Sequence, residues 1–278
     1  MSGSVWMGRL LTGLRYAISG LLVVVALVPF AFMVLISFEH HRVITGNPLH
    51  WIPTEPTLTT YTDVLSLSGF PRWLLNSTFV AVVATLASLF VQSLAAYAFA
   101  CKRFAGREVL FYIVLAGLMV PGAMTLVPQF LIASKLGLLN TYAGLILPSL
   151  AGPLGVFLLR QYMLGIPQSL LDAARIDGCR EFGVYWRVAL PLSLPALGTL
   201  AIVTFTAHWR EFLWPLLVTT DDSMKTLPVG LASLAGQFDT DYGAQMAGAL
   251  LSLLPVIVLF LWLQRYFIRG LTAGALKE

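Results

Sequence analysis

Charged side chains are scarce in this chain. Only 11% of its 278 residues are Asp, Glu, Lys or Arg, whereas 58% are apolar. A soluble globular domain carries about 25% charged residues, so the composition argues against a soluble protein and favours one embedded in a membrane. The net charge of +4 is modest. Because the basic residues are distributed as membrane topology requires, this charge gives no indication of nucleic-acid binding.

Catalytic and metal-binding motifs are also missing. The chain has no G-x-x-x-x-G-K-[ST] stretch and no Gly-Lys pair, so no P-loop for ATP is present, and it has no H-E-x-x-H motif. Cys101 and Cys179 lack the spacing to other Cys or His that a metal site needs. A membrane enzyme would need clustered His, Asp or Glu, but the histidines are scattered at His40, His41, His50 and His208. We therefore expect no catalytic residue, metal or cofactor in this chain.

Six long apolar stretches are present instead. Each is close to the ~20 residues that a helix needs to cross the hydrocarbon core of a bilayer. They lie at about 16–38, 74–100, 108–128, 142–160, 195–217 and 244–264. The first is longer than the core of a signal peptide and lacks a small-x-small cleavage site, so it is interpreted as a span. The sequence predicts an all-α polytopic membrane protein in which residues 1–278 form a single transmembrane domain.

The basic residues orient these spans. With both termini in the cytoplasm, twelve basic residues fall inside: Arg9, Arg15, Lys102, Arg103, Arg107, Arg160, Arg175, Arg180, Arg187, Arg265, Arg269 and Lys277. Five fall outside or in the outer half of a span: Arg42, Arg72, Lys135, Arg210 and Lys225. An excess of Lys and Arg marks the cytoplasmic side. This excess places a loop at about 161–194 and a tail at about 265–278 in the cytoplasm.

The loop between the fourth and fifth spans predicts two short helices. Ser169 followed by Asp172 is a capping-box pattern, so the first helix should begin near Leu170 and end at Gly178. Ala173 and its neighbour Ala174 would leave a thin surface that another protein can approach closely.

The second helix of the loop should run from about Arg180 to Val188. We expect it to end before Leu190-Pro191, because the residue before a proline avoids helical geometry. From these local features alone, a hairpin that merely connects two spans is as good an interpretation as a surface that receives force from a soluble partner.

A longer pattern in this loop resembles that of a known family. Permease subunits of ATP-binding-cassette importers carry Glu-Ala-Ala, three residues, Gly, nine residues, Ile, one residue and Leu-Pro. Here Asp172-Ala173-Ala174, Gly178, Val188 and Leu190-Pro191 occur at that spacing. The chain most resembles the carbohydrate-uptake branch, the second permease subunit of maltose-type and glycerol-phosphate-type systems. Further segments that carry the resemblance are Met119–Pro121, Leu136–Thr141, Gly144–Pro148, Phe157–Gln161, Phe212–Leu216 and Gly270–Lys277.

The resemblance implies a function and a set of partners. It implies import of a sugar or sugar-like solute by alternating access in a bacterial inner membrane. The implied partners are a second permease subunit, two ATPase subunits that bind ATP and Mg²⁺, an extracytoplasmic substrate-binding protein and membrane lipid, with no nucleic acid. The implied ATPase-contacting residues are Asp172, Ala173, Ala174, Asp177, Gly178, Leu190 and Pro191. The resemblance also implies that the tail reaches towards the same interface. The alternative is a secondary transporter, which would predict inverted repeats and buried acidic coupling sites.

Polar and aromatic residues inside the spans are candidates for a substrate pathway. They are Gln92, His208, Trp209, Arg210, Glu211 and Trp214. An ionisable group inside a membrane normally faces protein or water. Arg210 stands where members of the resembled family commonly have Asn. Instead of lining a substrate pathway, it could form a structural ion pair with Glu211 or with a partner subunit. The tryptophans could form an aromatic belt or stack on sugar rings, and Gln92 could bond between helices.

Overall fold

The computed structural model describes the backbone of residues 2–39, 53, 55–67, 69–234 and 242–275, and the side chains of these residues except 2–10, 234, 263 and 265–275. Every regular element in these ranges is a helix, which confirms the all-α fold class. Arg42, which the sequence places outside, and Lys277, which it places inside, lie outside the described residues.

The chain separates into two compact units. One comprises Met1–Ser68 with Leu231–Leu253, and the other comprises Gly69–Gly230 with Leu254–Glu278. The single permease domain expected from the sequence stays a prediction.

The first unit contains α1 (Ser2–Ile36), which includes a 26-residue apolar stretch, Leu11–Ile36, with mean hydropathy 2.7. At ~1.5 Å per residue this stretch measures roughly 39 Å, more than the ~30 Å of a bilayer core. A short helix, α3 (Thr59–Ser66), follows. The Thr60 hydroxyl donates a 2.5 Å hydrogen bond to the Ser37 carbonyl, so α3 is tied to the end of the first span.

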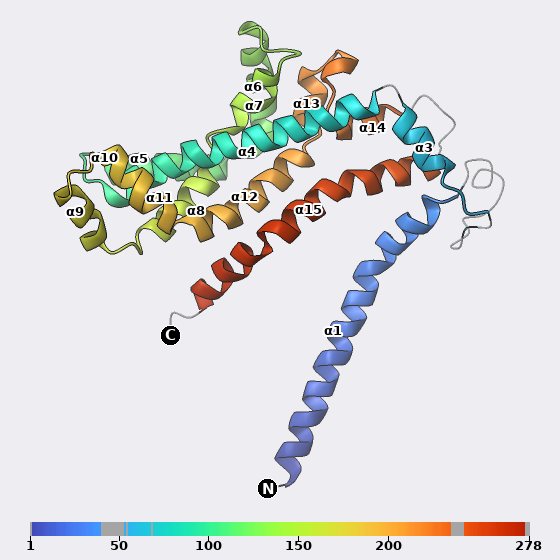
Figure 1. Cartoon of the computed structure of the whole chain (residues 1–278), viewed down its shortest axis with the longest axis horizontal. Helices are drawn as coiled ribbons and strands as arrows, with labels where there is room; N and C mark the ends of the chain where they lie inside the picture. The colour runs from blue at the N-terminus through green and yellow to red at the C-terminus, as the bar shows by residue number, and fades with distance from the viewer. Residues whose placement is uncertain (1, 40–52, 54, 68, 235–241, 276–278) are drawn as a thin grey trace. The chain divides into compact units, whose positions relative to one another are not determined.

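The second unit is organised around one long helix, α4 (Phe70–Cys101). It packs against α8 (Pro153–Met163) and α12 (Leu194–Trp209), as Figure 1 shows. Small residues on α4 permit the close approach, since Ala81, Ala84 and Ala96 are fully buried. Small side chains at a helix interface let backbones come together when no hydrophobic effect drives association inside the bilayer.

Two of the predicted spans, 108–128 and 142–160, are bent, and a third bend lies between the predicted loop and the fifth span. The pairs that could each form one span are Arg107–Met119 with Gly122–Lys135 (102°), Tyr142–Ser149 with Pro153–Met163 (49°), and Glu181–Leu192 with Leu194–Trp209 (77°). Pro121 and Pro153 stand at the first two breaks, where a missing N–H and a fixed φ interrupt the helix. With each bent pair counted once, the described residues hold up to six spans, as the sequence predicts.

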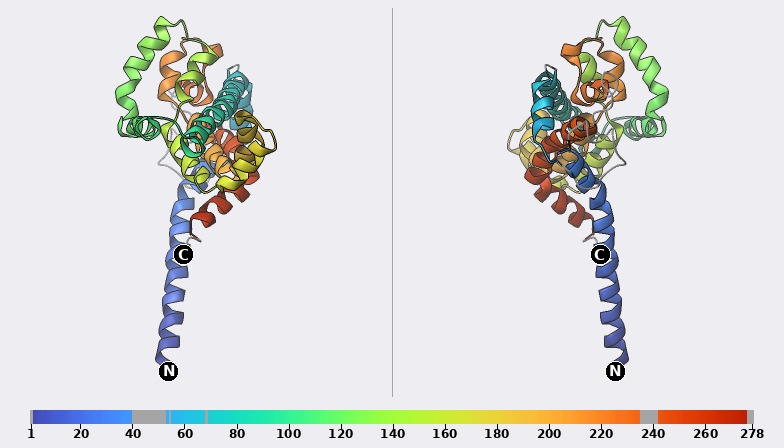
Figure 2. Two further views of the ribbon diagram at one scale, coloured as in Figure 1. Left: turned by 90° about the vertical axis from the view of Figure 1, so that its left-hand side faces the viewer. Right: turned by 90° about the vertical axis from the view of Figure 1, so that its right-hand side faces the viewer.

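The sharpest bend creates a projecting arm. The bend separates α5 (Arg107–Ala116) from α6 (Gly122–Lys135), and in both views of Figure 2 the green α6 projects at the side of the bundle. Its C-terminal part packs through Ala133 into one apolar cluster with Val80 and Ala84 of α4. Large apolar side chains on this arm are exposed, including Met119, Met124 and Val127. In a membrane protein such a surface faces lipid or another subunit.

Four further helices follow along the chain. They are α7 (Tyr142–Ile146), α13 (Leu213–Val218), α14 (Leu227–Leu234) and α15 (Tyr242–Ala275). The predicted fifth span, 195–217, is interrupted after Trp209 and resumes only at α13. Helix α15 passes through Pro255 and continues to Ala275, so the region expected as a tail from about 265 is the end of this helix.

Candidate functional site

The first loop helix, α9 (Gln168–Ile176), ends at a glycine that its backbone geometry requires. Gly178 has φ +85°, the left-handed region that favours glycine. The Cys179 N–H donates to the Ala174 carbonyl and the Gly178 N–H to the Arg175 carbonyl, both at 3.0 Å. These two bonds form a Schellman motif, which satisfies carbonyls that the helix end would leave unpaired. The predicted stop at Gly178 is confirmed.

The predicted start of α9 is wrong. The helix begins at Gln168, its N-cap is Pro167, and no side chain caps it. Instead of supporting a capping box, the Asp172 carboxylate accepts a 2.5 Å hydrogen bond from Arg175 Nη1 and one at 3.2 Å from Gln168 Nε2. Since Asp172 lies one helical turn from both residues, an i,i+3 ion pair and an i,i+4 contact form. The residue before the first turn is Pro167, whose φ of −57° already lies in the helical range, so the helix begins directly after it.

The predicted end of the second loop helix is also wrong. Helix α10 (Glu181–Val184) passes into a π-helical segment, Tyr185–Ala189, and then into α11 (Leu190–Leu192). Leu190 keeps helical angles (φ −64°, ψ −49°) although Pro191 follows it. A π turn is wider than an α turn, and this gives the proline ring the room that a regular α-helix denies it. The chain turns only at Ser193, before the 77° bend into α12.

The exposed residues of the loop include both small residues and large apolar side chains. Ala173, Asp177 and Gly178 are exposed. Beside them Ile176 has an exposed fraction of 86%, and on α10 and the π segment Phe182 is 60% and Trp186 52% exposed, with their rings stacked at 6.2 Å. The sequence pattern did not single out these three side chains. Large exposed apolar side chains on a segment expected outside the membrane are typical of a surface that contacts another protein.

The inner face of the loop packs against the α4–α8–α12 bundle. Leu171, Val184 and Tyr185 are almost fully buried, and Ala174 and Leu190 pack against the same cluster. The Tyr185 hydroxyl shares a 2.8 Å hydrogen bond with the Ser93 hydroxyl of α4. The residues expected to contact an ATPase therefore divide. Asp172, Ala173, Asp177, Gly178 and Pro191 are exposed, whereas Ala174 and Leu190 are half-buried on the inner side.

One carboxylate joins three elements at this end of the bundle. Glu181, the first residue of α10, forms an ion pair with Lys102 through Oε1. The same oxygen accepts a 3.2 Å hydrogen bond from Arg175 Nε of α9, and Oε2 accepts one of 3.2 Å from the Tyr97 hydroxyl of α4. The sequence pattern did not identify this cluster, because the four residues are widely spaced along the chain.

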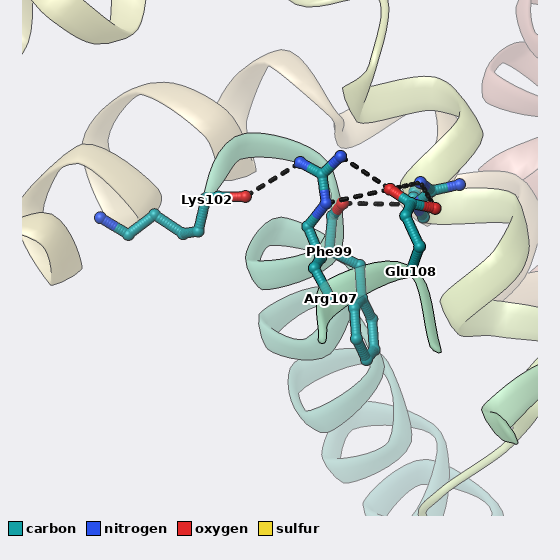
Figure 3. A network of polar contacts seen from close by, with 5 residues as sticks. Phe99, Lys102, Arg107 and Glu108 are labelled. Carbon is teal, nitrogen blue, oxygen red and sulfur yellow. Dashed lines mark hydrogen bonds and ion pairs between the residues drawn. The ribbon is translucent and has the colours of Figure 1, made fainter. Parts of the chain in front are cut away.

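A second polar network adjoins the first (Figure 3). Arg107 Nη1 donates to the Lys102 carbonyl at 3.0 Å, and Arg107 also bonds the Glu108 carboxylate at 2.7 and 3.0 Å. Arg160 of α8 donates to both Glu108 oxygens at 3.1 Å and to the Phe99 carbonyl at 3.2 Å. The Arg160 guanidinium, in a side chain only 10% exposed, is satisfied by paired charges rather than left alone, as a buried cation requires.

Gln92 lies between helices. Its Nε2 donates a 3.1 Å hydrogen bond to the Leu150 carbonyl, and its side chain is buried. A Cβ placed on Gly155 of α8 would come within 1.7 Å of Gln92 Oε1, so the glycine makes room for the amide. The structure thus places Gln92 in an interhelical contact, one of the two roles considered from the sequence.

The other pathway candidates surround the break between α12 and α13. Trp209 is buried and stacks on Phe205 at 5.7 Å. Trp214 is buried, and its Nε1 donates to the Gly144 carbonyl at 2.9 Å, so it anchors α13 against α7. Neither indole is a free stacking platform in this conformation. Glu211 Oε1 accepts a 3.4 Å hydrogen bond from the Trp214 N–H.

Two ionisable side chains at this break have unusual surroundings. The buried His208 Nε2 has no hydrogen-bond partner among the described residues. Arg210 is exposed, and the part of the chain that the structure describes contains no Arg210–Glu211 ion pair. The structural pair between these two residues, one of the alternatives drawn from the sequence, is therefore not formed here.

The opposite end of α4 is held by side-chain bonds to a loop. Asn76 Nδ2 donates to the Ser223 and Lys225 carbonyls at 2.9 Å, and Asn76 Oδ1 accepts from the Tyr142 hydroxyl at 2.7 Å. Next to it, the backbone N–H and the side chain of Ser223 hold the pKa of the Asp221 carboxyl below its ordinary value. Asn76 therefore ties α4 to the backbone of this loop and to α7.

Comparison with known proteins identifies the family. The sequence profile described as "Binding-protein-dependent transport system inner membrane component" matches residues 3–273. An arabinooligosaccharides transport system permease protein of Halalkalibacterium halodurans is 39% identical over 256 residues, covering 91% of this chain and 92% of the relative. A trehalose/maltose transport system permease protein of Thermococcus litoralis is 37% identical over 262 residues, covering 92% and 94%. The chain therefore belongs to the family of inner membrane components of binding-protein-dependent transport systems.

A solved structure agrees with the fold. One chain of a bacterial ABC transporter involved in the import of the acidic polysaccharide alginate superposes with a TM-score of 0.84, covering 93% of this chain and 97% of that chain at 23% identity. The family and relatives confirm the prediction of a permease subunit of an ATP-driven sugar importer over the alternative of a secondary transporter. The family is a class of transporter permeases and not of enzymes.

Proposed function

We propose that this chain imports an oligosaccharide across a bacterial inner membrane, and that its α9–α11 loop receives the force of ATP hydrolysis. The substrate class follows the printed names of the relatives, which act on arabinooligosaccharides and on trehalose or maltose. The chain works with a second permease subunit, two ATPase subunits and an extracytoplasmic binding protein. ATP and Mg²⁺ are bound by the ATPase subunits, and the chain itself carries no catalytic step.

The observation that carries the coupling role is the exposed apolar surface of the loop. Ile176, Phe182 and Trp186 expose large apolar side chains, and the small residues Ala173 and Gly178 of the same loop are exposed as well. An interface of this kind buries its apolar side chains against a partner and excludes water around them. We assign Asp172, Ala173, Asp177 and Gly178 to direct ATPase contact, and Ala174, Leu190 and Pro191 to the scaffold that shapes the surface.

The loop and both termini lie on the cytoplasmic side in this proposal. The excess of basic residues on that side supports the orientation. The α12–α13 break then lies towards the outer side, where the candidates for contact with the solute are the exposed Arg210 and His208, whose Nε2 has no hydrogen-bond partner among the described residues.

Reconstitution tests the proposal. The chain is co-expressed with its partner permease and ATPase, purified as a complex and placed in proteoliposomes with the cognate binding protein. We expect uptake of an oligosaccharide that depends on ATP and on the binding protein, together with ATP hydrolysis stimulated by the loaded binding protein. Uptake driven by an ion gradient without ATP would contradict the proposal. A binding screen of the binding protein over neutral and acidic oligosaccharides identifies the solute.

A further inference from the structure

The α9–α10 hairpin is joined to the bundle by two kinds of contact. Apolar contacts through Leu171, Val184 and Tyr185 hold the hairpin down but do not fix its direction. A buried hydrogen bond joins the Tyr185 hydroxyl to the Ser93 hydroxyl of α4, and the charged contacts converge on Glu181, whose two carboxylate oxygens bind groups from α9 and from the end of α4. Charge-assisted hydrogen bonds are directional, so Glu181 sets the orientation of the hairpin relative to α4.

Lys102 extends this connection to two further helices. Its ammonium group pairs with Glu181, and its backbone carbonyl accepts a hydrogen bond from Arg107 at the start of α5. The carboxylate of Glu108 follows, between Arg107 and Arg160 of α8, and Arg160 returns to α4 at the Phe99 carbonyl. The chain of bonds therefore runs without a gap from Asp172 on α9, through Arg175 and Glu181, to the ends of α4, α5 and α8.

We propose that the Lys102–Glu181 ion pair transmits movement of the α9–α10 hairpin to the α4–α5–α8 end of the bundle, with Glu181 as a positioning residue for coupling. This inference rests on the proposed function, since it requires an ATPase that moves the hairpin. A packed interface moves between discrete arrangements instead of deforming continuously. A directional link between hairpin and bundle makes the two change arrangement together.

The exposure of the pair separates this role from a role in folding. The Lys102 side chain is 32% exposed and that of Glu181 49% exposed. Ion pairs at such positions contribute little to stability, and the apolar contacts of the hairpin remain when the pair is removed. Loss of the pair should therefore uncouple the hairpin without unfolding it. Arg160 is unsuited to this test because its guanidinium is buried and would be left unpaired when Glu108 is changed.

The test compares Glu181→Gln, Lys102→Met and the double variant in the reconstituted complex. The readouts are solute transported per ATP hydrolysed, the ratio of stimulated to basal ATP hydrolysis, co-elution of the subunits and the melting temperature of the complex. We expect each single variant to lose transport per ATP by about 2- to 30-fold, the range that residues along coupling networks show. Because both variants break the same pair, the double variant should lose no more than the worse single one.

Two controls accompany these variants. Asp222→Asn breaks an ion pair with Lys225 at the opposite end of α4, and we expect its transport per ATP to match wild type. Lys102→Arg keeps the charge and should restore most of the coupling lost in Lys102→Met. Unchanged melting temperature and co-elution in all variants are expected, since a purely structural role would alter these readouts first.

Several outcomes would overturn the inference. If both single variants transport as much solute per ATP as wild type, the pair does not transmit the movement. The same conclusion follows if the loss of transport per ATP in the double variant is the product of the two single losses. Failure of both single variants to assemble would mean that the pair holds the fold. The proposed function is judged separately: it fails if the wild-type complex shows no ATP-dependent uptake. Suppose that the wild-type complex couples ATP hydrolysis to transport, that Gly178→Asp does not, and that Glu181→Gln still does. In that case the proposed role of the ion pair is wrong and the proposed function stands.

Discussion

Gly178 fixes the end of α9 through its backbone alone. A Cβ added there would meet no atom within 4 Å, so its φ of +85° and not crowding is what excludes other residues. Gly137 closes α6 in the same way, with φ +67°, open space around it and the same pair of hydrogen bonds. Gly178 lies on the proposed ATPase-facing surface and Gly137 does not. Comparing substitutions at the two positions therefore distinguishes the effect of backbone strain from the effect on ATPase contact.

Gly178→Ala should therefore cost the helix end ~1–2 kcal/mol and also reduce ATP hydrolysis stimulated by the binding protein, because the strained end displaces Asp177. Gly178→Asp should abolish the stimulated hydrolysis while membrane insertion persists. Gly137→Ala is the matched control, with a similar fall in melting temperature and normal stimulation. The measurement is ATPase activity of the purified complex with and without binding protein. Full stimulation in Gly178→Asp would remove the coupling assignment.

Arg210 is the second residue whose surroundings define a test. Its exposed guanidinium makes no ion pair with Glu211, which instead binds the Trp214 N–H. A guanidinium binds a carboxylate or phosphate through two parallel hydrogen bonds, which an asparagine cannot reproduce. Arg210→Asn should lower uptake of acidic oligosaccharides more than that of neutral ones, with ATPase docking unchanged. Initial uptake rates across a panel of both sugar types decide it, and an equal loss on both would exclude recognition of charge.

At the scale of elements, α4 and α8 approach each other through a glycine and an amide. Gln92 of α4 donates to the Leu150 carbonyl and occupies the space above Gly152 and Gly155 at the start of α8. Pro153 starts α8 directly after the 49° bend. The bend, the absence of a side chain at Gly155 and the Gln92 amide therefore together set how closely α4 and α8 pack.

Gly155→Ala should destabilise this contact by ~1–3 kcal/mol, the range for overpacking, because the new methyl group would lie 1.7 Å from Gln92 Oε1 and 3.0 Å from Leu200 Cδ2. Gln92 must then leave its hydrogen bond. In a Gln92→Ala background the same substitution should cost clearly less, since most of the clash is gone. Melting temperatures of the four proteins in a double-mutant cycle measure this, and additive losses would contradict the proposed clash.

At the scale of the whole molecule, the distribution of charge predicts the orientation. The Asp177 end of the loop should face the cytoplasm, and the Asp222 region should face the other side. The Asp222 side chain is 80% exposed and Asp177 is also exposed, so a cysteine at either position would be open to reagents.

Cysteine labelling measures this orientation. In a chain with Cys101→Ser and Cys179→Ser, a membrane-impermeant maleimide added to intact cells should label the Asp222→Cys variant and leave Asp177→Cys unlabelled. Permeabilised cells should show labelling of both. The reverse pattern in intact cells would overturn the proposed orientation of the loop.

Part of the site could be predicted from local sequence and part could not. The stop at Gly178 followed from a glycine at the end of an apolar-and-small segment, because a left-handed residue is a local requirement. The start of α9 was mispredicted because Asp172 had two possible partners, the helix start or Arg175, and the ion pair formed. The continuation through Pro191 was missed because a π segment, which no local pattern signals, accommodates the proline.

The sequence by itself determined the class of the protein. Apolar stretches of span length, the side on which basic residues gather, and a loop motif of seven residues at fixed spacing can all be read along the sequence. Only the tertiary structure decided that Ile176, Phe182 and Trp186 are exposed and that Glu181 contacts Tyr97 and Lys102. The Tyr97–Glu181 bond joins residues 84 positions apart, and bent spans bring such residues together in ways that no single segment encodes. The packing of the helices, rather than the propensity of any one of them, therefore set the geometry of the site.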